Sequence, residues 1–145
     1  MEIRYKIELL DETGFSYKPD FNYEDIDINA ITYQFSHSLT PIMNKGELSI
    51  SMTAEISPEG SNVILAKEDV YAVFKIDPFD KVIQIKEGGF TTTEPRLIDT
   101  FISIMIGALR GMLVKNLKGT PLAKSVMPLI PMDVIRQNSV RLIQD

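Results

Sequence analysis

Apolar and polar residues alternate through most of the first half of the chain. In the third of four such stretches, Leu48, Ile50 and Met52 alternate with serine and threonine, which is the period of a strand with one buried face. The first two stretches share this pattern, and the fourth is apolar toward both of its ends. We therefore expect four strands, near residues 3–10, 30–40, 47–57 and 62–76.

The residues between these stretches indicate how the strands are connected. Asn44-Lys45-Gly46 is a turn signal that joins the second and third strands in a hairpin. The charged run over residues 67–69 predicts a bulge in the fourth strand. Residues 11–24 are rich in turn formers, and residues 77–87 either extend the sheet or bridge to the next element. The outer faces carry serine, threonine and glutamate, which predicts an antiparallel sheet with one solvated face.

The second half changes to a helical period. Residues 96–117 contain no proline and are apolar around most of the helical circumference, which predicts a long helix that is buried on most sides. Asp99 and Arg110 interrupt the apolar run, so we do not expect it to span a membrane.

Small residues recur at every fourth position of this helix, in a row that contains Ser103, Gly107 and Gly111. An interior glycine costs about 1 kcal/mol of helix propensity relative to alanine. We therefore expect these small residues to serve a packing role that offsets this cost. One interpretation is a close helix–helix contact in a homo-oligomer. The alternative is that these residues lie under the chain's own sheet.

A proline-punctuated apolar segment follows the helix. Gly119 stands where a helix C-cap is expected, and the prolines at 121, 128 and 131 exclude regular structure across Thr120–Pro131. This segment nevertheless carries five large apolar residues, so we expect it to cover a hydrophobic surface. A second helix is predicted over Met132–Leu142, with Asp133 in its first turn. The expected fold is an α+β domain over residues 1–145, in which the helices and the segment cover one face of the sheet.

The amino-acid composition argues against several classes of function. A net charge of −5 argues against a nucleic-acid or anionic-membrane surface. There is no cysteine, and His37 is the only histidine, so we expect no disulfide, metal site or cofactor. His37 is interpreted as a structural residue, and no phosphate-binding loop or nucleophile elbow is present. We therefore expect a protein that is not an enzyme. The N-terminus has no signal-peptide pattern, so a cytoplasmic location is expected.

Two stretches of the second half resemble the SecB-like export chaperones. In that family four strands precede a long helix that carries an Ala-Arg pair and ends in an Arg-Gly-Thr turn. Ala108-Leu109-Arg110-Gly111 and Lys118-Gly119-Thr120-Pro121 are similar to those motifs. The segment Met127–Ile135 looks like the family's crossover into its second helix.

The resemblance implies an ATP-independent holdase that binds unfolded or extended client polypeptides in an apolar groove. It also implies a dimer of dimers and, for members that serve export, the translocation ATPase as a partner. Methionines such as Met105, Met112 and Met127 lie in the predicted helix and the segment that follows it. Their flexible, polarizable side chains suit such a binding surface. The residues expected to line the client site are Met112, Leu113, Val126, Met127, Leu129 and Ile130.

Three other functions are consistent with the same pattern. The apolar surface can enclose a pocket for a small hydrophobic ligand or lipid. Alternatively, the apolar surface is buried between subunits of the protein's own oligomer, and the protein is then a scaffold. Some SecB-like chaperones serve a dedicated client in a toxin–antitoxin system, and this chain fits such a role as well.

Overall fold

The main sheet is built from four long strands in the spatial order β1-β4-β3-β2, and every neighbouring pair is antiparallel. The computed structural model describes residues 2–139 and 143–144. The strands of this sheet are β1 (Arg4–Tyr17), β2 (Ile31–Ile42), β3 (Glu47–Pro58) and β4 (Ala66–Asp77). The order is that of a Greek key, because β2, β3 and β4 are consecutive hairpin partners and β1 lies beside β4. The predicted four-stranded antiparallel sheet is confirmed.

Short helical turns and a second, smaller sheet complete the architecture. The 3-10 turns are Tyr23–Asp25, Ile28–Ala30 and Met43–Lys45, and the helices are α1 (Phe79–Val82), α2 (Pro95–Asn116) and α3 (Met132–Ser139). The strands β5 (Ile83–Lys86) and β6 (Gly89–Thr92) form a hairpin, and β7 (Ile143–Gln144) pairs in parallel with β6. Residues 77–87 therefore neither extend the main sheet nor form a simple bridge, and the separate sheet was not predicted.

β1 is longer and less regular than its sequence pattern indicates. It continues to Tyr17, through residues interpreted as a turn-rich connection. Register shifts occur between Ile7 and Leu9 and between Glu12 and Gly14. Because each shift adds one residue to β1, Leu9 pairs with Val73 and lies on the opposite face from Ile7.

The predicted bulge in β4 is wrong. β4 runs in unbroken register with β3 from Lys75 to Ala66, and the irregularities lie in the facing strand β1. The charged run was misread because its residues alternate between faces. Glu68 points to the buried side, while Lys67 and Asp69 stay partly exposed. The buried Glu68 interrupts the apolar sequence pattern, but the strand itself stays regular at this position.

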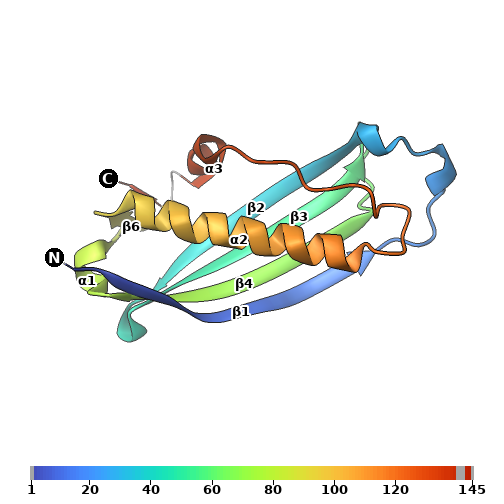
Figure 1. Ribbon diagram of the computed structural model, residues 1–145. Coiled ribbons are helices and arrows are strands. Elements are labelled where there is room, and N and C mark those ends of the chain that lie inside the picture. Colours follow the sequence, from blue (N-terminus) through green and yellow to red (C-terminus); the bar gives the residue numbers. More distant parts are fainter. Residues whose placement is uncertain (1, 140–142, 145) are drawn as a thin grey trace.

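The long helix α2 covers the inner face of the main sheet and crosses it diagonally (Figure 1). The predicted helix is confirmed, and Pro95 occupies its first turn, where its missing N–H is not needed. Phe101 stacks on Phe74 of β4 with ring centroids 4.1 Å apart, and meets Tyr5 of β1 edge-on at 5.6 Å. The buried side chains recur at spacings of three and four residues: Ile98, Phe101, Ile102, Met105, Ile106, Leu109 and Leu113.

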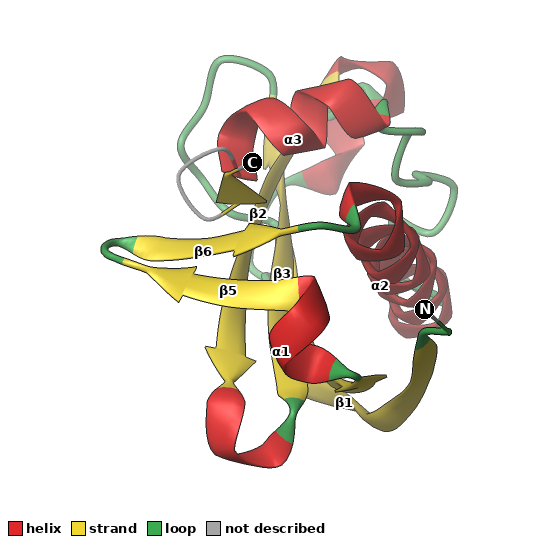
Figure 2. Ribbon diagram, turned by 90° about the vertical axis from the view of Figure 1, so that its left-hand side faces the viewer, coloured by secondary structure: helices red, strands yellow, loops and turns green. Residues whose placement is uncertain are grey.

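α2 is less completely buried than its composition predicts. Ile104 and Val114 are exposed, and so is the row of small residues that contains Gly107. The end-on view in Figure 2 shows α2 packed against the sheet on one side only. By length and composition alone this helix can cross a membrane, so the sequence argument against a span was too strict. One such helix is weak evidence of a span, because the core helix of a sheet-packed domain has the same composition.

The segment after α2 returns along the inner face of the sheet toward α3 (Figure 1). Gly119 adopts a left-handed φ of 80° just beyond the helix, as expected of a C-terminal glycine. α3 begins at Met132 with Asp133 in its first turn, as predicted. The remainder of the predicted second helix, over 140–142, lies outside the described residues.

Candidate functional site

The segment Thr120–Pro131, called the crossover below, is held on the sheet by polar contacts to its backbone and side chains. The Arg110 guanidinium donates from Nε to the carbonyl oxygen of Met127 and from Nη2 to that of Pro128, both at 3.1 Å. Near its middle, the hydroxyl of the buried Ser125 contacts that of Tyr33 on β2. These contacts fix the crossover on the β2 side of α2.

The crossover has a buried side and an exposed side. Leu122 and Met127 are buried among the core residues, with Met127 only 3% exposed. Val126 is 57% exposed and Leu129 is 88% exposed. The expectation that this segment covers a hydrophobic surface is met by the first pair, while the second pair presents apolar side chains to solvent.

Only part of the predicted client-binding set is accessible in this conformation. Leu113, 2% exposed, and Met127 belong to the core, so neither can contact a ligand without rearrangement. Ile130 is partly buried against the core. Val126 and Leu129 are the exposed members on the crossover, and Met112 is half-buried on α2.

Met112 does not lie with the crossover residues. Residues two apart on an α-helix are separated by about 200°, so Met112 and Arg110 point to opposite sides of α2. Arg110 holds the crossover on the β2 side, whereas Met112 faces β1. β1 and β2 are the two edges of the sheet, so the predicted site is divided between the two sides of the helix.

On the β1 side, Met112 lies in a groove of about 540 Å³ between the helix and the edge strand. Gly111 forms part of the same wall, so one residue of the predicted oligomer row borders the groove. The groove is open to solvent and mainly apolar along its length. Its lining residues are Leu10, Glu12, Ala108, Gly111, Met112, Lys115 and Asn116. The sequence did not indicate Leu10 or Ala108, because Leu10 reaches this face only through the first bulge of β1.

Among the residues that line this groove, the side-chain amide of Asn116 bridges two carboxyl groups. Asn116, the last residue of α2, donates through Nδ2 to Glu12 Oε2 at 2.6 Å and to Glu68 Oε1 at 2.7 Å. Glu68 is fully buried, and its second oxygen, Oε2, has no hydrogen-bond partner among the described residues. Burial, followed by the adjacent carboxyl of Glu12, raises the pKa of Glu68 to about 8. Glu68 is therefore mostly protonated at neutral pH, an arrangement that sequence inspection did not reveal.

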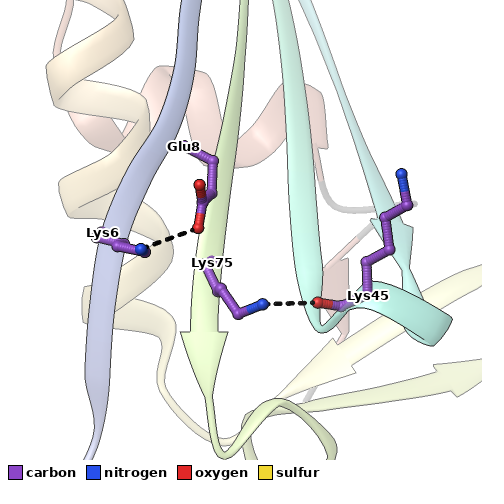
Figure 3. Close-up of polar contacts among 4 residues, drawn as sticks. All are labelled: Lys6, Glu8, Lys45 and Lys75. Atoms are coloured by element: carbon purple, nitrogen blue, oxygen red, sulfur yellow. Dashed lines mark hydrogen bonds and ion pairs between the residues drawn. The ribbon is translucent and has the colours of Figure 1, made fainter.

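A second, more polar hollow of about 290 Å³ lies near the start of β1. Lys6 of β1 and Lys75 of β4 are direct cross-strand partners, which places two like charges side by side. Figure 3 shows how each is offset: Lys6 pairs with Glu8 at 3.2 Å, and Lys75 reaches the backbone carbonyl of Lys45 at 3.5 Å. Such exposed ion pairs contribute little stability and suggest no chemistry.

The row Ser103, Gly107 and Gly111 faces away from the sheet. All three residues are exposed, and a Cβ atom added at Gly107 or Gly111 would meet no atom within 4 Å. The alternative that this row lies under the chain's own sheet is therefore wrong. The row is available to a second chain, which leaves the predicted oligomer contact open.

His37, the only histidine of the chain, lines a hollow of about 170 Å³ together with Ser36, Ser38, Ser51 and Thr53. His37 lies on β2 beside Phe35, and burial lowers its pKa. Among the described residues, no three histidine, cysteine, aspartate or glutamate side chains are grouped as they would need to be to hold a metal ion. The hollows at His37 and at the start of β1 are the more polar ones, whereas the groove beside α2 is mainly apolar.

No protein-family model matches the chain, and no curated protein matches it either.

Proposed function

We propose that this protein is an ATP-independent holdase that binds unfolded or extended segments of client proteins. The observation that carries the proposal is the apolar surface left uncovered on both sides of α2. On one side the crossover exposes Val126 and Leu129, and on the other the groove lies beside exposed apolar residues of β1. Exposed apolar patches are typical of binding sites.

The edge strand β1 supports the same proposal. Its five exposed large apolar side chains are Tyr5, Ile7, Leu9, Leu10 and Phe15. β1 pairs only with β4 within the described sheet, so its other edge presents free backbone donors and acceptors. An extended client can therefore add backbone hydrogen bonds to apolar contacts, a mode of recognition that tolerates many sequences.

The open groove favours a holdase over a carrier of a small ligand. A carrier site buries most of its ligand in a concave pocket. This groove is bordered by Lys115 and by the Glu12 carboxyl, and it is open along the edge of the sheet. Under the proposal the protein acts in the cytoplasm without a cofactor, as an oligomer, either for export with the translocation ATPase or for a dedicated toxin–antitoxin client.

The exposed crossover residues provide the direct test. Val126→Ser and Leu129→Ser, separately and together, should weaken suppression of client aggregation several-fold while the melting temperature changes little. Met43→Ser is the matched control, because Met43 is equally exposed but lies in the β2–β3 turn. Light scattering of a chemically denatured client, with and without each variant, gives the measurement.

A buried residue of the crossover gives the contrasting result. Met127→Ser should destabilise the fold by about 2–5 kcal/mol because it removes a core side chain. Any loss of holdase activity in that variant should follow the loss of folded protein. If the Val126 and Leu129 double variant remains folded and fully active, the crossover is not part of the client site.

A further inference from the structure

The lining of the groove between β1 and α2 includes a group of polar side chains that the proposed holdase activity does not use. Asn116 has two amide protons on Nδ2, and it donates to both the Glu12 and the Glu68 carboxyl groups. These contacts join β1, β4 and the last residue of α2 at one point. They are direct hydrogen bonds between the C-terminal end of α2 and the edge strand with its neighbour.

The unpartnered Oε2 atom of Glu68 indicates where a proton resides. An ionised carboxylate that is fully buried with one oxygen unpaired carries a large desolvation cost. A protonated Glu68 avoids this cost, and its proton is available to the Glu12 carboxyl, which the Asn116 amide holds close by. The geometry therefore fits two carboxyl groups that share one proton.

The charges around Glu68 favour retention of that proton. From β1 it is faced by Glu12, and from α2 by the neutral Asn116, with Lys115 further along the groove and exposed. β3 presents Ala54 at the paired position. Within β4, the neighbouring Asp69 adds a negative charge from the opposite face, where it binds the Thr53 hydroxyl at 2.5 Å.

We propose that the proton held between Glu68 and Glu12 latches the end of α2 onto β1, and that its loss opens the groove. Ionised Glu68 would lie beside the Glu12 carboxylate, with the charge of Asp69 on the opposite face of the sheet, and the single amide of Asn116 cannot neutralise these charges. Separation of α2 from β1 lets water reach the carboxylates and widens the space lined by Leu10 and Met112. The inference rests on the proposed function for the ligand, an apolar client segment, that the opened groove admits.

The direction of the pH dependence follows from linkage. In the opened state Glu68 has its ordinary pKa near 4.5, while in the latched state its pKa is about 8. Between these two values the latched state retains a proton that the opened state has lost. The opening equilibrium therefore rises about tenfold per pH unit from about pH 5 to pH 8, and it is constant at higher pH.

Amide hydrogen exchange measures this opening directly. After correction for the intrinsic pH dependence of exchange, amides over 12–16 and 113–117 should exchange about tenfold faster per pH unit up to about pH 8. Amides of β2 should not follow this slope and serve as an internal reference. Glu68→Gln cannot lose a proton, so the slope should be absent. Glu55→Gln removes an acid on β3 outside the group and should retain the wild-type slope.

A second variant, Glu12→Gln, tests the latch independently in case Glu68→Gln does not fold. Glu12 is exposed, and Glu12→Gln removes the charge that helps to hold the proton, so the slope should end at a lower pH than in the wild type. The latch would be overturned if exchange in the wild type were independent of pH. It would also be overturned if Glu68→Gln or Glu12→Gln kept the wild-type pH dependence of exchange.

Measurements of client aggregation distinguish a failure of the latch proposal from a failure of the proposed function. If both hold, aggregation should be suppressed more strongly at pH 8 than at pH 6 in the wild type and equally at both in Glu68→Gln. An exchange slope without any holdase activity refutes the proposed function and keeps the latch. Activity without the slope refutes the latch and keeps the function.

Discussion

Two glycines, Gly14 and Gly107, occupy opposite environments, and a methyl group added to each should have opposite effects on stability. At Gly14, within the second bulge of β1, an added Cβ would lie 3.0 Å from Asp69 Oδ2. The Asp69 side chain is held by Thr53 and cannot move freely. At Gly107 on α2 an added Cβ would meet nothing within 4 Å.

Gly107→Ala should increase the free energy of unfolding by about 0.5–1 kcal/mol, because alanine has the higher helix propensity. Gly14→Ala should lower it by about 1 kcal/mol through the contact with Asp69. Urea unfolding followed by circular dichroism measures both. A destabilised Gly107→Ala variant would show that another chain occupies the exposed side of α2.

A single buried acid should control part of the pH dependence of stability. Because the pKa of Glu68 is raised from about 4.5 to about 8 on folding, its stabilising contribution is complete below pH 4.5. That contribution is lost at about 1.4 kcal/mol per pH unit as the pH rises toward 8. Glu68→Gln should therefore become progressively more stable relative to the wild type across this range. Urea titrations at four pH values test this, and a difference that is constant with pH would contradict it.

At the scale of elements, the crossover depends on one side chain of α2. Arg110 donates two hydrogen bonds to consecutive carbonyls of a segment that has no regular structure of its own. Prolines remove backbone donors from this segment, so side-chain contacts take over the role that a sheet or helix would have.

Arg110→Met keeps an unbranched side chain but removes both donors. It should destabilise the fold by about 1.5–3 kcal/mol, the range for hydrogen bonds from a charged group. The crossover should then be cut faster by a protease of broad specificity. Lys118→Met is the control, because Lys118 is exposed just beyond α2. Equal cleavage of the Arg110 variant and the wild type would show that the burial of Leu122 and Met127 is enough to hold the crossover.

For the whole molecule, two exposed surfaces compete as sites of assembly. One is the row Ser103, Gly107 and Gly111 on α2, and the other is the free edge of β1. A long apolar edge strand tends to pair with another chain unless charges block it. Both surfaces fit the proposed homo-oligomer.

Leu9→Lys places a charge on the outer face of β1, away from the groove, while Gly107→Leu fills the row on α2. Whichever surface forms the contact, its variant should lower the mass measured by light scattering at micromolar concentration without changing the melting temperature. Val63→Lys, an exposed apolar position in the β3–β4 connection, is the control for added charge. A monomeric wild-type protein would contradict the proposed assembly altogether.

The local patterns predicted the elements better than they predicted the site. Alternation identified β2, β3 and the core of β4, and the helical period identified α2, because both periods report which side of an element meets the core. The same reasoning failed where contacts are distant in sequence. The one predicted bulge was assigned to β4, whereas both register shifts lie in β1, and the sequence did not distinguish the buried Leu113 and Met127 from exposed apolar residues.

The sequence by itself determined the type and order of the main elements, the crossover without regular structure and the apolar excess on α2. These features depend on residues close along the chain, whose propensities and periods act locally. Only the tertiary structure decided that Met112 faces β1 while Val126 faces outward near β2, and that Glu68, Glu12 and Asn116 meet at one point. Those arrangements depend on the rotation of α2 over the sheet and on two one-residue shifts in β1. Both are set by packing between segments that are distant along the chain.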